Sequence, residues 1–122
     1  MNKYTESEVE YSVAIITSTI TKCEKMQLKF SEGSSQHSLL KNRIKALYIS
    51  KVLLNGDDLS LYTKKEIEDA LPPIVSIISK TTKAQAKYEK GNPYYTRHEP
   101  MLHAMKMARA CLEDRIERDI YK

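Results

Sequence analysis

Two short segments of the sequence, with the residues that follow them, bring cations, amides and aromatic rings together, and this combination suits an anionic ligand. They are residues 33–38 (GSSQHS) and 91–96 (GNPYYT), and each leads into a predicted helix. A helix N-terminus offers backbone amides and a partial positive charge to a phosphate, and a tyrosine ring offers a face to a base. An ordinary polar turn with good helix caps is the alternative. The candidate ligand-binding residues here are Gln36, His37, Lys41, Arg43, Tyr94, Tyr95, Arg97 and His98.

Two more pairs of candidates precede these segments at matching positions. Lys25 and Lys83 each stand in the middle of a lysine stripe at helical spacing, which either binds phosphates or lies on a solvated flank whose aliphatic stems cover apolar surface. Gln27 and Gln85 fall on apolar seams, where a polar side chain must find a hydrogen-bond partner. Each glutamine therefore either contacts a ligand or bonds the backbone of the turn.

The residues typical of catalysis and metal binding do not form a recognisable pattern. His98 and His103 share a predicted helix, but they are not four residues apart and no carboxylate stands in metal-binding register with them. The Glu-x-x-His sets of a di-metal helical bundle are missing, as is a glycine-rich phosphate loop. We therefore predict a protein that is not an enzyme and that uses no metal and no cofactor.

The elements that must position these residues come from an internal repeat. Residues 4–54 align without a gap on residues 62–112, at an offset of 58 residues, and about a quarter of the aligned pairs are identical. Each copy reads as a helix, a tight turn and a second helix. Apolar residues recur at helical spacing along all four segments. The predicted inward residues are Val9, Val13, Ile16, Ile20, Cys23, Phe30, Leu40, Ile44, Leu47, Leu54, Ile67, Leu71, Ile74, Ile78, Tyr88, Leu102, Met105, Leu112 and Ile116.

Local signals indicate where these helices begin and end. Capping boxes start the first and third helices at Thr5–Glu8 and Thr63–Glu66, and a further box at Thr96–Glu99 is expected to start the fourth. Gly33 and Gly91 are expected to end the first and third helices, because glycine enters the left-handed cap conformation without steric cost. The second helix is expected over about residues 35–54, with 55–56 (NG) stopping it.

These elements predict an all-α protein in which two tandem helical hairpins form a four-helix bundle. The 122 residues suffice for a single domain over 1–122, with hairpin repeat A at 4–54, a linker at 55–61 and hairpin repeat B at 62–120. Pro72 and Pro73 fall inside the third helix, so that helix is expected to be kinked or broken there. One hairpin alone buries too little apolar area, so the two must pack together.

Composition narrows the environment and the partners. The net charge of +4 and the pI near 9.0 are compatible with an anionic partner, although a solvated lysine-rich surface explains them equally. Two widely separated cysteines indicate small buried side chains in a reducing compartment. The polar N-terminus is unlike a signal peptide and no apolar run is long enough to span a membrane, so we predict a cytoplasmic protein without a membrane partner. The second helices are too long and too apolar for a helix-turn-helix, and nucleic acid is not expected.

The segment 36–47 (QHSLLKNRIKAL), with the helix before it, resembles small uncharacterised helical proteins of Firmicutes and their prophages. The resemblance covers the first hairpin well and the second loosely. It implies an intracellular accessory protein, consistent with phage-borne helical proteins that sequester nucleotide signals of host defence.

Two functions are therefore carried forward. The first is a non-catalytic binding protein that takes an anionic small ligand such as a nucleotide at the hairpin tips, as a homo-oligomer whose subunits help to close the site. The alternative is a protein–protein adaptor that uses the exposed side of the third helix, with Pro72 and Pro73 shaping a groove or a dimer face.

Overall fold

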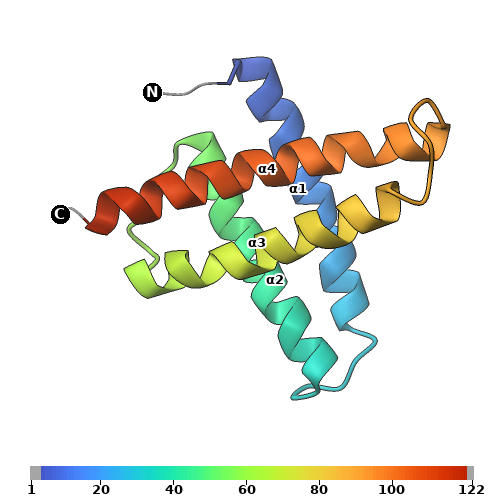
Figure 1. Ribbon diagram of the computed structural model, residues 1–122. Helices are drawn as coiled ribbons and strands as arrows, with labels where there is room; N and C mark the ends of the chain where they lie inside the picture. The colour runs from blue at the N-terminus through green and yellow to red at the C-terminus, as the bar shows by residue number, and fades with distance from the viewer. Residues whose placement is uncertain (1–3, 121–122) are drawn as a thin grey trace.

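Four helices make up the part of the chain that the computed structural model describes, residues 4–120, and this range contains no strand. They are α1 (Glu6–Gln27), α2 (Ser35–Asn55), α3 (Lys64–Gln85) and α4 (Pro93–Ile120). Figure 1 shows α1 and α2 as one hairpin, with the hairpin of α3 and α4 laid across it. The predicted all-α fold built from two hairpins in a four-helix bundle is confirmed.

The packing of the helices follows the internal repeat. The repeat matches α1 with α3 and α2 with α4. Both α2 and α4 pack against three other helices, whereas α1 and α3 do not approach each other within the described residues. This pattern is the one expected for two copies related by a pseudo-two-fold axis between α2 and α4. The matched alanines Ala46 and Ala104 are both fully buried, which lets the helices that carry them approach closely.

One continuous core joins the two hairpins. Its fully buried side chains come from matched positions of both copies, such as Ile16 with Ile74 and Leu47 with Met105. The buried hydroxyl of Ser12 donates to Sδ of Met107 on α4 at 3.1 Å, so it has a partner. Phe30 and Tyr88, which were expected to face inward, are exposed instead. They lie beyond the ends of α1 and α3, where the helical spacing that predicted their burial no longer applies.

The first and third helices begin at the predicted capping boxes. Oγ1 of Thr5 accepts from the Glu8 amide at 3.1 Å, and the Glu8 carboxylate accepts from the Thr5 amide at 3.1 Å. Thr63 and Glu66 repeat the arrangement at 3.0 and 2.9 Å. Each pair satisfies amides that the first helical turn leaves without partners.

The same two glutamates also link the hairpins. Oε2 of Glu8 lies 3.4 Å from Nε2 of His103 on α4, and Oε2 of Glu66 pairs with the Lys45 ammonium on α2. His103 and Lys45 occupy matching positions of the repeat, so the two ion pairs are related by the pseudo-two-fold axis. Each carboxylate therefore caps its own helix and holds the opposite hairpin.

Three predicted helix ends were wrong. The helices α1 and α3 end at Gln27 and Gln85, so Gly33 and Gly91 do not cap them; these glycines adopt φ of 88° and 101° later in the connecting loops. The helix α4 begins at Pro93 rather than at Thr96. Asn92 accepts from the Tyr94 amide through its side chain at 2.9 Å, and Pro93 has a backbone angle that suits the first helical position. Thr96 is thereby placed within the helix, and its hydroxyl bonds the Asn92 carbonyl instead of a capping partner.

The two prolines of α3 do not interrupt it. The helix runs from Lys64 to Gln85 through Pro72 and Pro73, so the expected break does not occur. A proline has no amide proton, and the carbonyls of Glu68 and Asp69, four residues earlier, consequently lose their usual helical donors. The stop of α2 at Gly56, with φ of 71°, is confirmed.

The dual role of Glu8 predicts a pH-dependent stability. The Thr5 amide, and to a smaller extent His103, lower the pKa of Glu8 below its ordinary value. Its contribution to folding is therefore present above the pKa of the unfolded chain and is lost as the pH falls through the lowered folded value. We expect Glu8→Gln to be less stable than the native chain at about pH 6, and the gap to close at about pH 3. Urea denaturation at both pH values measures this gap. Glu10→Gln is the control, and a gap for Glu8→Gln that does not change with pH would contradict the assignment.

Candidate functional site

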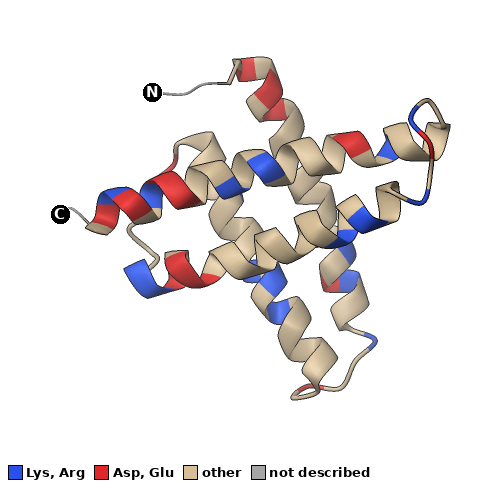
Figure 2. Cartoon of the chain, in the orientation of Figure 1, with Lys and Arg blue, Asp and Glu red and all other residues tan. Residues whose placement is uncertain are grey.

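Positive charge concentrates at the two ends where the hairpins turn. We call residues 22–43 the first tip and residues 80–101 the second tip. Each contains five Lys or Arg and two Glu, so each tip has a net charge of +3, whereas the whole chain has a net charge of +4. Figure 2 shows acidic residues at the opposite end of α1, where Glu6, Glu8 and Glu10 lie. An anion approaching the molecule is therefore attracted to the tips.

The two tips do not combine into one site. Figure 1 shows them projecting in different directions, the first at the bottom and the second at the right. This follows from the crossing of the hairpins, because parallel hairpins would place both turns at one end. The candidate residues are thus divided into a first-tip group with Lys41 and Gln36, which are exposed, and a second-tip group with Tyr94 and Arg97.

The second tip holds a cluster of planar groups. The rings of Tyr88 and Tyr94 stack with centroids 5.2 Å apart, and the ring of His98 stacks with Tyr88 at 6.4 Å. The guanidinium of Arg97 lies over the Tyr94 ring, 5.2 Å from its centroid. Nδ1 of His98 lies 2.6 Å from the Tyr94 carbonyl oxygen, which holds the imidazole in place. Tyr94 stays 51% exposed, so part of this cluster is open to a ligand.

The helix N-termini at the two tips differ in what they offer to an anion. At the second tip the amides of Tyr94 and Tyr95 bond the side chain and the carbonyl of Asn92, and Pro93 has no amide proton. The amides expected for phosphate binding are therefore occupied there. At the first tip the side chain of Ser34 accepts from the His37 amide at 3.2 Å. The amides between these two residues lie at the first positions of α2, where a helix has no carbonyl to offer them.

The seam glutamines bond the backbone of the opposite arm of their hairpins. Nε2 of Gln27 donates to the His37 carbonyl at 3.3 Å, and Nε2 of Gln85 donates to the Tyr95 carbonyl at 3.1 Å. The two bonds are related by the repeat offset. Gln85 is buried, and its bond fixes the start of α4 against the end of α3. Both glutamines thus have the structural role that the sequence allowed as an alternative to ligand contact.

The remaining candidates are placed as follows. Lys25 and Lys83 are exposed on the last turns of α1 and α3. Arg43 is partly buried rather than free at the tip, and its buried Nε has no hydrogen-bond partner among the described residues. Its guanidinium lies near Cys23. Burial raises the pKa of the Cys23 thiol, and the nearby Arg43 charge opposes that rise.

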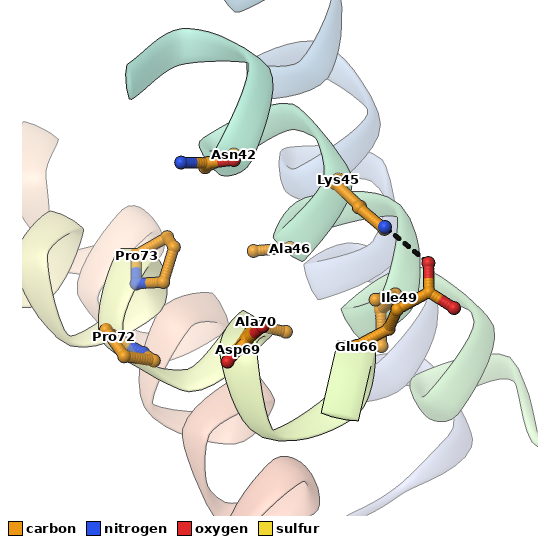
Figure 3. A pocket seen from close by; sticks show the side chains of 9 residues that line it. All are labelled: Asn42, Lys45, Ala46, Ile49, Glu66, Asp69, Ala70, Pro72 and Pro73. Atoms are coloured by element: carbon orange, nitrogen blue, oxygen red, sulfur yellow. Dashed lines mark ion pairs between the residues drawn. The ribbon is translucent and has the colours of Figure 1, made fainter. Parts of the chain in front are cut away.

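A pocket of about 350 Å³ lies between α2 and α3, and of its lining residues only Asn42 belongs to a tip. Figure 3 shows the Lys45–Glu66 pair at one end of it, the alanines Ala46 and Ala70 on its floor and the two prolines at the other end. None of these residues was a candidate ligand contact by sequence, although a groove was expected at Pro72 and Pro73. The sequence signal for this pocket is that the two copies of the repeat differ at its positions. Asp69 and Pro73 stand where the first copy has Tyr11 and Ile15, so smaller side chains leave the space open.

Comparison with known proteins leaves the function to be argued from this geometry. No protein family, curated protein or solved structure matches the chain. Among residues 4–120 there is no group of His, Cys, Asp and Glu side chains that could hold a metal ion. None of the helices described here is both long enough and apolar enough to cross a membrane.

The glutamine bonds can be tested by truncation. Gln85→Ala removes the hydrogen bond that joins the end of α3 to the Tyr95 carbonyl of α4, so we expect the free energy of unfolding to fall by about 0.5–1.5 kcal/mol. Gln27→Ala should cost less, since Gln27 is less buried and its bond is longer. Urea denaturation of both variants measures the difference. Native stability in Gln85→Ala would show that the bond does not hold the hairpin together.

Proposed function

We propose that this chain is a non-catalytic binding protein that takes an anionic small ligand of the nucleotide class at its second tip. The observation that carries the proposal is the cluster of Tyr88, Tyr94 and Arg97, in which a guanidinium already lies over an aromatic ring that is stacked on a second ring. A nucleobase stacks on such groups, and the guanidinium adds a cation–π contribution. Lys83 and Lys87, on the same tip, would neutralise the phosphates.

The openness of the second tip supports an oligomer. Small-molecule sites bury most of the ligand surface, usually in a concave pocket. Tyr94 and Arg97 lie at the start of α4 and remain exposed, so one chain can cover only part of a nucleotide. We propose that a second subunit covers the remainder, which would make ligand binding and self-association reinforce each other.

Substitutions at Arg97 separate stacking from charge. Isothermal titration calorimetry with ATP and with inorganic tripolyphosphate as probes compares the native chain, Arg97→Ala and Arg97→Lys. We expect Arg97→Lys to weaken ATP binding about three- to thirtyfold, because the planar stack on Tyr94 is lost while the charge remains. Tripolyphosphate has no base, so its binding should change little in Arg97→Lys and should weaken in Arg97→Ala.

Leu39→Ala is the matched control, because Leu39 occupies the position of Arg97 in the first repeat. It should leave ATP binding unchanged. Equal affinities of the native chain and Arg97→Ala for ATP, or no heat of binding at millimolar ATP, would exclude a nucleotide site at the second tip.

A second candidate function is favoured by the pocket between α2 and α3. We propose that it serves as the contact surface of a protein–protein interaction module, with a second copy of the chain as the first partner to examine. Its floor of Ala46, Ile49 and Ala70 is apolar, and its rim carries Lys45, Glu66 and Asp69, so it offers both shape and opposite charges. This combination of an apolar centre and a polar rim is typical of protein interfaces.

A blocking substitution tests this second function. Asn42 is exposed on the rim, so Asn42→Arg should fill the opening without disturbing the core. We expect the dimer dissociation constant of Asn42→Arg to be at least about tenfold higher than that of the native chain, as measured by sedimentation equilibrium. Asn55→Arg, at the exposed end of the same helix, is the control with the same charge change. A dimer that both variants leave intact does not use the pocket.

A further inference from the structure

The first tip exposes a group of large apolar side chains at its end. We call Met26, Leu28, Phe30 and Leu39 the apolar cap. Leu28 is 87% exposed, Leu39 53%, Met26 48% and Phe30 36%. Single exposed apolar residues are common on protein surfaces, but four between residues 26 and 39, on the end of α1, the loop and the start of α2, indicate an interaction site.

The second tip serves as an internal reference for this cap. It has the same hairpin loop, with the same glutamine bond to the opposite arm and the same left-handed glycine. Yet the positions of Met26, Leu28 and Leu39 are occupied there by Ala84, Ala86 and Arg97. The loop therefore does not need apolar side chains at these positions to fold. The apolar side chains of the cap therefore serve a contact with a partner outside the hairpin.

Cations surround the cap. Lys25 and Lys29 alternate with the apolar residues along the chain, Lys22 lies one turn earlier on α1, and Lys41 follows Leu39 on α2. Lys22, Lys25, Lys29 and Lys41 are all exposed. Two acidic residues lie among these cations, Glu32 in the loop and Glu24 on α1, whose carboxylate accepts from the Tyr48 hydroxyl. A partner of the cap should thus present apolar surface with negative charge around it.

The shape of the tip selects among such partners. Figure 1 shows the end of the α1–α2 hairpin projecting beyond the crossing point, clear of α3 and α4. A projecting apolar turn offers no groove for a peptide or a helix to lie in. It can enter a deformable surface, and the boundary between the headgroups and acyl chains of a bilayer accepts apolar side chains while anionic lipids attract the lysines around them.

We propose that the first tip attaches the protein to the surface of anionic lipid membranes, with the apolar cap inserted at the headgroup boundary and Lys22, Lys25, Lys29 and Lys41 against the lipid phosphates. This proposal replaces the sequence-based expectation of no membrane partner, which rested on the lack of a membrane-spanning run, because surface attachment needs no such run. It is independent of the nucleotide site proposed at the second tip, which points in another direction.

Vesicle binding tests the proposal, and the repeat supplies the matched variant. The variant Met26→Ala/Leu28→Ala/Leu39→Arg installs the residues of the second tip on the first. It keeps all four lysines and adds a positive charge, so attraction to anionic lipid alone would strengthen binding, whereas insertion of the cap requires binding to weaken. We expect the partition coefficient on vesicles of phosphatidylcholine with phosphatidylglycerol to fall at least about tenfold in this variant.

Two further arms examine the electrostatic part. Binding of the native chain should weaken on vesicles of phosphatidylcholine alone, and also in about 1 M salt, where charges are screened beyond about 3 Å. Lys25→Glu/Lys29→Glu, which leaves the cap intact, should lower the partition coefficient by more than about fivefold for each lysine changed. Tyr11→Ala removes an exposed apolar side chain of α1 away from the tip and should have no effect.

Each outcome decides the proposal. Weaker binding of both tip variants, with Tyr11→Ala unchanged, supports it. No binding of the native chain to anionic vesicles overturns it, as does equal or tighter binding of the apolar-cap variant. If sedimentation without vesicles shows that the native chain self-associates and the apolar-cap variant does not, the cap contacts a second copy and the membrane assignment is wrong. Circular dichroism verifies folding, and the lysine variant and the salt series decide the question if the apolar-cap variant fails to fold.

Discussion

Burial of the apolar faces of two hairpins against each other is the interaction on which the rest of this structure depends. A single hairpin leaves one face of both its helices in water, and isolated helices of this length are marginal without tertiary packing. Because the halves are copies, one contact between them buries the apolar faces of both hairpins. Matched residues such as Ile16 and Ile74 are accordingly both fully buried. The pseudo-two-fold axis between α2 and α4 is the geometric expression of this shared requirement.

The duplicated core leaves the surfaces of the two copies free to differ. One hairpin linkage pairs Glu66 with a permanently charged lysine and the other pairs Glu8 with a histidine. One tip ends in apolar side chains and the other in stacked rings with a guanidinium. A pocket opens where Asp69 and Pro73 replace bulkier side chains of the first copy. The functions proposed for this protein all lie at these points of divergence, since the core itself is common to both halves.

Much of the fold and part of the candidate site could be read from local patterns, and the failures have specific causes. The capping boxes at Thr5 and Thr63 involve residues three apart, so their hydrogen bonds could be anticipated. Gly33 was predicted to end α1, but α1 ends at Gln27. The Gln27 side chain bonds the His37 carbonyl and so joins the two arms of the hairpin at that point. The pattern Thr-x-x-Glu predicted a start of α4 at Thr96, but Asn92 and Pro93 start the helix earlier, through the bond of the Tyr94 amide to the Asn92 side chain.

The sequence by itself determined the number and type of the helices, their pairing into two hairpins and most residues of the core. These depend on periodicity, on caps and on the repeat, all of which act along the chain. The crossing of the hairpins was decided only by the tertiary structure, since it depends on how side chains from distant segments fit together. That crossing separates the tips, exposes the apolar cap on a projecting turn and opens the pocket beside Pro72 and Pro73. Residues that looked like one ligand site along the sequence are therefore two surfaces in space.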